Sequence, residues 1–371
     1  MFYFDNAATT PLTDTVIEVM SQTMSSIFGN PSSTHAYGRN ANKLLRDCRN
    51  QVAQIFATDP RKIIFTSGGT ESNNTAIKGY ALANQDKGKH IISTAIEHHS
   101  VLHTLDYLKE RFGFEITYLK PIKGQIFSQQ IQEALRDDTI LVSTMFVNNE
   151  TGDILPIQEI GSILREHQAV FHVDAVQAVG KFPVHPEKLN IDFLSASAHK
   201  FHGPKGTGIL YANSLHFDSL LHGGEQEEKH RASTENLVGI KGLTQALLSC
   251  HKNQENYLQH VKKLKSIFLR ELSEIDHYLN SEETALPHVV NIGFPNYNND
   301  ALLAQLDLSG FAVSTGSACT AGTVSPSHVL MAKYGSNSQR LKESIRISFS
   351  EQNTYDEVEA LCKKIKEIVG K

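Results

Sequence analysis

Several features that would narrow the function of this protein are scarce in its sequence. The 371 residues include no tryptophan and four cysteines, Cys48, Cys250, Cys319 and Cys362. No two cysteines have the C-x-x-C spacing of metal and redox sites, and four thiols in so long a chain do not form a disulfide framework. We therefore expect free thiols in a reducing, cytoplasmic compartment.

A strong charge bias and long apolar runs are also missing. The formal net charge at pH 7 is −5, and lysines and arginines form no stripe along the chain. We therefore expect no direct contact with nucleic acid. No apolar run approaches the roughly 18 residues that span a membrane. The N-terminal MFYFDNAATTPL has no basic region and is interrupted by Asp5, so it is not typical of a signal peptide.

Short apolar runs alternate with amphipathic stretches between residues 62 and 212. Runs such as TILVSTMFV and AVFHVDAV are almost continuous in apolar residues, as in strands that are buried on both faces. The alternation predicts an α/β fold with a mainly parallel sheet, in which one strand runs the other way, and helices on both faces.

The C-terminal third has a different pattern. A long helical stretch, or two helices, covers residues 243–275, and the predicted strands HVVNIGFP, FAVSTGSA and SIRISFS follow before a closing helix. This mixture predicts a smaller α+β domain. We place the large domain at residues 14–250 and the small domain at residues 1–13 and 251–371.

Three motifs follow predicted strands, where open α/β sheets bind ligands. The glycines of TSGGTESNN (residues 66–74) form either a plain turn or a turn that presents N–H groups to a phosphate. Lys200, in SASAHKFHGPKG, is either a surface lysine or a desolvated amine suited to a Schiff base. Asp174, in HVDAVQ, is either a structural carboxylate or the partner of a protonated ring nitrogen. Together they match three groups of pyridoxal phosphate, which are the phosphate, the aldehyde and the ring nitrogen.

Cys319 differs from the other cysteines in its surroundings. It lies in STGSACTAG (residues 314–322), among small residues, and no helical or strand pattern includes it. A thiol in such a segment is a candidate nucleophile, whereas the other three cysteines fall in helical patterns typical of packed residues. The histidine pairs His98–His99 and His199–His202 lack the H-E-x-x-H pattern of a helical zinc site, so we expect no metal site.

The motifs occur with FDNAATTPL, GNPSSTHAYGR, IEHHSV, NNETG, GGEQE, PSHVL and SIRIS along almost the whole chain. As a set they resemble the cysteine desulfurases, which are pyridoxal-phosphate-dependent enzymes of the aminotransferase superfamily with fold type I. The segment around Cys319 is similar to the subgroup with the longer cysteine loop. The resemblance implies pyridoxal 5'-phosphate as cofactor, a large domain with a mainly parallel seven-stranded sheet, a smaller α+β domain and a homodimer.

The resemblance also implies roles for residues around the cofactor ring. Lys200 would form the Schiff base, and Asp174 would keep the ring nitrogen protonated. Gln177 would bond the phenolic oxygen of the ring. His98 would stack on the ring and exchange a proton with the substrate thiol, and Asn149 would approach both ring and substrate.

Further residues would bind the phosphate, the substrate and the sulfur. The expected phosphate ligands are Gly69, Thr70, Ser197 and His199, together with Thr234, which would reach the site of the neighbouring subunit. Arg346 would grip the substrate carboxylate through its planar fork. Cys319 would accept the sulfur. Two positions depart from the family pattern, since Ser233 and Ser350 stand where glycine is usual.

The implied reaction converts L-cysteine to L-alanine and leaves the sulfur on Cys319 as a persulfide. The sulfur would pass to an acceptor protein, either an iron–sulfur scaffold or a tRNA thiolase. Two alternatives stay open. One is an aminotransferase of the same fold, in which Cys319 is incidental, and the other is a non-catalytic sulfur-relay partner.

Overall fold

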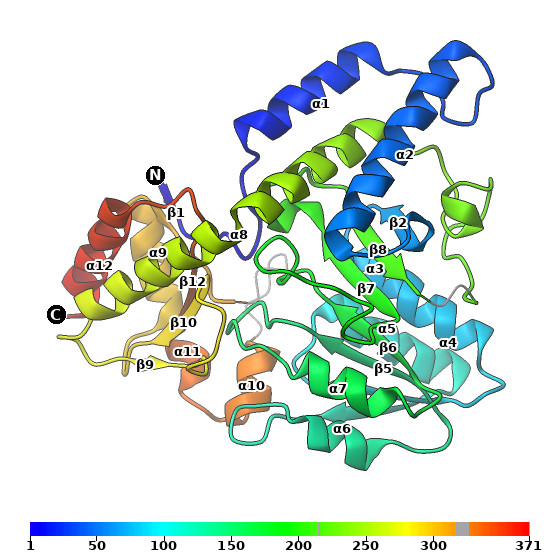
Figure 1. The fold of residues 1–371 in the computed structure, drawn as a ribbon. Helices are drawn as coiled ribbons and strands as arrows, with labels where there is room; N and C mark the ends of the chain where they lie inside the picture. The colour runs from blue at the N-terminus through cyan, green and yellow to red at the C-terminus, as the bar shows by residue number, and fades with distance from the viewer. Residues whose placement is uncertain (214–215, 317–325, 371) are drawn as a thin grey trace.

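The structure, a computed structural model, describes residues 1–213, 216–316 and 326–370 (Figure 1). Within these residues a seven-stranded sheet forms the centre of the large lobe, by which we mean this sheet and the helices packed on it. Neighbouring strands are parallel except where β8 pairs with β2 and β7. The α/β fold with one reversed strand is confirmed. The strand order is β2 (Ile63–Thr66), β8 (Gly208–Ala212), β7 (Phe193–Ser197), β6 (Val170–Asp174), β5 (Thr139–Met145), β3 (His90–Thr94) and β4 (Glu115–Leu119).

Helices cover both faces of this sheet, because successive strand residues point to opposite sides. In β2, Ile63 and Phe65 belong to one hydrophobic core and Ile64 to another. The first core lies under α1 (Asp14–Ser26), α2 (Ala36–Phe56), α6 (Ser128–Ala134), α7 (Ile157–Leu164) and the start of α8 (Leu237–Glu271). The second lies under α4 (Tyr80–Ala83) and α5 (His99–Phe112), with the π-helical turn η2 (Thr75–Gly79) and α3 (Gly69–Asn74) before them.

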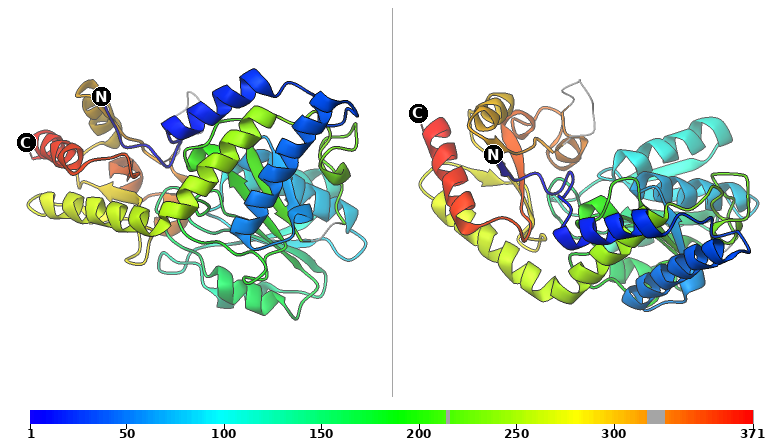
Figure 2. Two further views of the ribbon diagram at one scale, coloured as in Figure 1. Left: turned by 45° about the horizontal axis from the view of Figure 1, so that its top comes forward. Right: turned by 90° about the horizontal axis from the view of Figure 1, so that it is seen from above.

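The small lobe contains a three-stranded antiparallel sheet and a short parallel strand pair (Figure 2). The sheet has the order β12 (Ser344–Ser348), β10 (Val289–Gly293) and β9 (Tyr278–Leu279), and the pair is β1 (Phe2–Tyr3) with β11 (Phe311–Ala312). Its helices include α9 (Asn299–Leu308), α11 (Arg340–Glu343) and α12 (Tyr355–Val369), whereas Val329 of α10 (His328–Tyr334) belongs to the core of the large lobe. Phe4 is fully buried in this core, so the start of the chain packs with its end.

The predicted long helix is one continuous helix, α8, and it joins the two lobes (Figures 1 and 2). Leu243 and Leu247 pack in the core of the large lobe, whereas Leu264 and Phe268 pack in that of the small lobe. A boundary within α8 is compatible with the predicted domains, but the position of residue 250 stays a prediction. None of the helices in the described ranges combines the length and apolar character needed to cross a membrane.

One predicted strand is shorter than its sequence suggested. Only Phe311 and Ala312 of FAVSTGSA form a strand, β11, and Ser314 then forms an isolated bridge with Arg346. Gly316 has a φ of +100°, a left-handed conformation that turns the chain out of an extended path. The last two residues of that motif lie outside the described ranges. The other described cysteines are helical as predicted, with Cys48 and Cys362 buried and Cys250 partly exposed.

Candidate active site

The carboxyl ends of β2, β3, β5, β6 and β7 surround a pocket of about 330 Å³. Because parallel strands end at one edge of the sheet, residues from distant parts of the sequence meet there. Ten of the twelve predicted site residues line the pocket, and these are Gly69, Thr70, His98, Asn149, Asp174, Gln177, Ser197, His199, Lys200 and Arg346.

Lys200 follows β7 in the short 3-10 helix η3 (Ala198–Lys200). Its Nζ donates to the carbonyl oxygens of Ala7 and Ala8, at 2.7 and 2.8 Å. The motif FDNAATTPL thus supplies main-chain acceptors for the lysine. The chain beyond the lysine is also held, since buried Lys181 donates from its Nζ to Lys200 O at 3.2 Å. Bonds to the Lys200 side chain and to its backbone carbonyl therefore both hold this lysine at the pocket.

Asp174 ends β6 with its side chain almost fully buried. One carboxylate oxygen accepts a hydrogen bond from Asn73 Nδ2 at 2.8 Å, and the other accepts from the backbone N–H of Val176 at 3.0 Å. Gln177 follows on the same turn, where its Nε2 donates to Ala7 O at 2.9 Å. These bonds fix a carboxylate and an amide side by side in the pocket wall.

His98 caps the N-terminus of α5, because its Nδ1 accepts from the backbone N–H of Ser100 at 3.1 Å. An accepting Nδ1 carries no proton, so the neutral ring holds its proton on Nε2. Burial lowers the pKa of His98; Asp174 opposes this shift and Lys200 adds to it. His98 is therefore a neutral imidazole near pH 7.

The TSGGTESNN segment forms a tight turn into α3. Gly68 has a φ of +149°, and a Cβ built at Gly69 would lie 2.7 Å from Val176 Cγ2. Side chains larger than hydrogen would fill this concave turn, which suits the close approach of a ligand to the backbone. Gly69 and Thr70, at the start of α3, and Ser197, at the end of β7, all line the pocket.

Arg346 enters from β12 of the small lobe, and it is 2% exposed. Its Nη1 donates to Asn149 O at 2.9 Å and to Gly316 O at 3.3 Å, and its Nη2 donates to Asp5 Oδ1 at 2.7 Å. The guanidinium borders the pocket but is already paired with a carboxylate. We did not predict this role of Asp5, although FDNAATTPL was identified as a motif.

Two predicted residues are not at this pocket in the described chain. Thr234 is exposed and does not line it, and Cys319 lies outside the described residues. Asn73 and Ser100 were missed by sequence reasoning, since each acts through a side chain, Asp174 or His98, that the sequence did indicate. In the described ranges no group of three His, Cys, Asp or Glu residues is arranged to hold a metal ion.

The two departures from the family pattern have different surroundings. Ser233 is exposed and has a φ of +98°, a conformation that glycine adopts more easily. Ser350 is buried, and its backbone N–H donates to Asn353 Oδ1 at 2.9 Å. The strain therefore falls at Ser233 and not at Ser350.

Comparison with known proteins agrees with this arrangement. Residues 2–361 match the family described as Aminotransferase class-V. The chain is 49% identical to IscS 1 of Bacillus subtilis (strain 168) over 372 residues, which cover 99% of this chain and 98% of that protein. It is 45% identical to the cysteine desulfurase IscS of Methanosarcina thermophila over 373 residues, which cover 100% of this chain and 92% of that enzyme.

Solved structures extend the agreement to three dimensions. A NifS-like protein superimposes with a TM-score of 0.93 at 36% identity, covering 100% of this chain and 99% of that chain. A structure of SspA in complex with cysteine superimposes with a TM-score of 0.83 at 35% identity, covering 95% of this chain and 100% of that chain. The architecture is thus the fold type I arrangement that the sequence predicted. The chain belongs to the class-V aminotransferase family, within which its relatives are cysteine desulfurases.

Proposed function

We propose that this protein is a cysteine desulfurase that converts L-cysteine to L-alanine and retains the sulfur as a persulfide on Cys319. The observation that carries the proposal is the pocket itself. An amine, a buried carboxylate, a neutral imidazole and a guanidinium, from four separate segments, border one space of about 330 Å³. The full-length similarity to cysteine desulfurases supports the same reaction.

The pocket residues fit pyridoxal phosphate. A buried carboxylate needs a cationic partner, and a protonated ring nitrogen beside Asp174 would provide one. The turn at Gly68 and Gly69, bordered by Thr70, Ser197 and His199, would hold the phosphate. Lys200 would bind the aldehyde. When bound, the cofactor supplies an electron sink for the electrons at the substrate Cα.

The chain's own residues would orient the substrate and move its protons. Arg346 and Asn149 would hold the amino-acid end of cysteine, with Arg346 binding the carboxylate. The Lys200 amine would carry the Cα proton. His98, which holds its proton on Nε2, would exchange a proton with the substrate thiol.

Sulfur transfer would then follow by attack of the Cys319 thiolate on the substrate sulfur. A new S–S bond forms and the substrate Cβ–S bond breaks. The electron pair of the broken bond stays with the carbon fragment, which takes up a proton and leaves as alanine. The two sulfur atoms are oxidised as the carbon is reduced, so no external oxidant or reductant is needed.

The other cysteines are poor candidates for this attack. Burial raises the pKa of Cys250 and of Cys362 to about 12, and it also raises the pKa of Cys48. These side chains stay neutral thiols near pH 7, whereas the thiolate is the reactive form. Because the other three thiols stay protonated, Cys319 is the proposed nucleophile.

The partners belong to the same proposal. A homodimer would bring Thr234 to the phosphate site of the second subunit. The persulfide would be delivered to an acceptor protein, an iron–sulfur scaffold or a tRNA thiolase. Cysteine as a substrate is also supported by a related solved structure, which is of SspA in complex with cysteine.

One assay separates this function from its two alternatives. The purified protein, loaded with pyridoxal phosphate, is given L-cysteine and a reductant, and alanine and sulfide are measured with and without a keto acid. We expect equal amounts of alanine and sulfide, independent of the keto acid. A product that requires the keto acid would instead indicate an aminotransferase, and no alanine from loaded protein would indicate a sulfur-relay partner.

A further inference from the structure

Glu150 is a buried carboxylate that contacts described residues on both sides of the segment 317–325, which contains Cys319. The side chain is 1% exposed and follows Asn149 in the loop after β5. Ser327 Oγ donates to its Oε2, and a Cβ built at Gly316 would lie 2.9 Å from the same oxygen. One carboxylate oxygen therefore accepts a hydrogen bond from Ser327 and lies close to Gly316.

Both of these residues are held by other contacts as well. Gly316 N–H donates to Ser314 Oγ at 3.2 Å, and Gly316 O accepts from Arg346 Nη1 at 3.3 Å. Ser327 caps α10, because its Oγ accepts from the Leu330 N–H at 3.0 Å. The two ends of the segment are thus ordered structure, and Glu150 lies between them.

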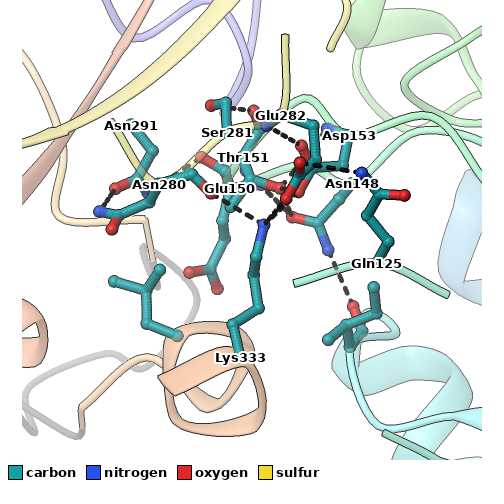
Figure 3. A network of polar contacts seen from close by, with 12 residues as sticks. Gln125, Asn148, Glu150, Thr151, Asp153, Asn280, Ser281, Glu282, Asn291 and Lys333 are labelled. Carbon is teal, nitrogen blue, oxygen red and sulfur yellow. Dashed lines mark hydrogen bonds and ion pairs between the residues drawn. The ribbon is translucent and has the colours of Figure 1, made fainter. Parts of the chain in front are cut away.

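The loop of Glu150 is itself tied to both lobes. Asn148 Oδ1 accepts from the N–H groups of Glu150 and Thr151, at 2.9 and 3.0 Å. From the small lobe, Asn291 Nδ2 donates to Glu150 O at 3.0 Å. Figure 3 shows these side chains gathered in one polar cluster. These hydrogen bonds therefore restrict the backbone conformation at Glu150.

An ion pair fastens α10 to the same loop. Lys333, whose side chain is 1% exposed, pairs with Asp153 Oδ2 at 2.6 Å and donates to Asn280 O at 2.8 Å (Figure 3). Asp153 Oδ1 accepts from the Glu282 N–H at 2.8 Å. The loop 148–153, the last turn of α10 and the chain at 280–282 therefore form one connected unit.

This unit adjoins the substrate side of the pocket. Asn149, the neighbour of Glu150, lines the pocket, and its carbonyl oxygen bonds the same Arg346 nitrogen that bonds Gly316. Burial makes ionisation of Glu150 unfavourable and raises its pKa, whereas the bond from Ser327 and the charge of Arg346 act in the opposite direction. Burial of a carboxyl group costs free energy unless hydrogen bonds or nearby charges compensate for the lost water.

We propose that Glu150 is a positioning residue for sulfur transfer, because its contacts with Gly316 and Ser327 set both ends of the Cys319 segment relative to Asn149 and Arg346. The inference rests on the proposed function, in which Cys319 has to meet the sulfur of a substrate held by Arg346. Misplacement of a reacting group by about 1 Å can cost about a hundredfold in rate. A side chain that bonds Ser327 and lies close to Gly316 would limit such misplacement.

The first test compares Glu150→Ala with Glu150→Gln, which keeps an oxygen that can accept from Ser327. We expect Glu150→Ala to lower kcat for alanine formation about ten- to a hundredfold. KM for cysteine should stay within about threefold, because Arg346 keeps its bonds to Asn149 and Asp5. Glu150→Gln should recover most of kcat. Equal kcat in the wild type and Glu150→Ala, or a loss that appears only in KM, would overturn the proposal.

A matched control addresses general destabilisation. Asp192 is another largely buried carboxylate, whose oxygens accept from the Phe171 N–H and Asn213 Nδ2 away from the pocket. Asp192→Asn should destabilise the fold and leave kcat unchanged. If it lowers kcat as much as Glu150→Ala at equal loss of stability, the positioning role is wrong. Should Glu150→Ala not fold, Ser327→Ala removes the same contact from the other side, and its kcat is judged by the same criterion.

A second readout does not depend on the cofactor. In cofactor-free protein we expect iodoacetamide to alkylate Cys319 at least about threefold faster in Glu150→Ala, while the alkylation of Cys250 stays unchanged. Equal rates at Cys319 would contradict the proposal. Failure of the proposed function itself is recognised separately, because Cys319→Ala would then still form alanine at the wild-type rate.

Discussion

Arg346 holds three segments of the chain together with a single guanidinium group. It bonds Asp5 near the N-terminus, Asn149 in the loop after β5, and Gly316 beside the Cys319 segment. In its proposed role, Arg346 would bind a substrate carboxylate while Asp5 already balances its charge. Recognition of the substrate and the placement of the surrounding segments would then depend on the same side chain.

The first prediction concerns this guanidinium. Arg346→Ala should raise the apparent KM for cysteine about ten- to a hundredfold, because a charge-assisted contact contributes about 1.5–3 kcal/mol. Cofactor content should be unchanged, since no expected cofactor ligand is removed. Steady-state kinetics with Arg340→Ala as control, an arginine that bonds Asn280 in the small lobe, tests this. An unaltered KM would assign the carboxylate to another arginine, with Arg39 first.

The second prediction concerns the strained serine. Ser233 has a φ of +98°, so Ser233→Gly should relieve backbone strain of about 1 kcal/mol, partly offset by the greater freedom of glycine in the unfolded chain. We expect the free energy of unfolding to rise by about 0.5 kcal/mol, measured by urea denaturation. A loss of stability would show that the serine hydroxyl contributes more than its backbone costs.

At the scale of elements, the parts of the pocket that follow from local pattern were predictable from sequence. β5, β6 and β7 are buried, mostly apolar strands, so Asp174 falls at the end of β6 and Lys200 shortly after β7 by chain order alone. Ala7 lines the pocket and Asp5 reaches Arg346 because β1 joins β11 and Phe4 packs in the small lobe. Their contacts depend on packing between distant segments, which no local pattern shows. Glu150 lies in the motif NNETG, but its burial could not be predicted from the sequence.

The third prediction tests α8 as the connection between the two cores. Lys252 is exposed in the middle of α8, so its replacement removes no buried contact. Lys252→Pro should cost about 3 kcal/mol or more, because proline removes a helical hydrogen bond and clashes with the preceding turn. We expect calorimetry to show two unfolding transitions in place of one, since the lobes lose their rigid link.

Lys252→Ala is the control for this change, because alanine is a good helix former and should leave the melting profile almost unchanged. A single transition at the wild-type temperature in Lys252→Pro would mean that contacts elsewhere, such as those of Ala7 and Glu150, couple the lobes without α8.

For the whole molecule, buried histidines make stability depend on pH. His172 is fully buried between Ser143 and Ser195 in the central sheet, and burial lowers its pKa to about 3. In the unfolded chain a histidine takes up a proton near pH 6.5. Between these values the unfolded state binds one more proton than the folded state, so stability falls as the pH falls below about 6.5.

The fourth prediction follows from this sign. Between pH 6 and pH 5 the wild type should lose about 1 kcal/mol more stability than His172→Gln, because only the wild type has this histidine to protonate on unfolding. Urea denaturation at each pH measures the difference, and comparison of the two proteins cancels the other titrating groups. His251→Gln, at an exposed position of α8, should behave as the wild type does. Equal slopes for all three proteins would contradict the prediction.

The proposed reaction depends most on Cys319, which would receive the sulfur. The direct measurement is a single turnover of the cofactor-loaded protein with limiting L-cysteine and no reductant, followed by peptide mass spectrometry and alanine analysis. We predict one added sulfur atom on Cys319 for each alanine released, and unmodified Cys48, Cys250 and Cys362. Alanine released with Cys319 unmodified, or sulfur on one of the three helical cysteines instead, would contradict the account.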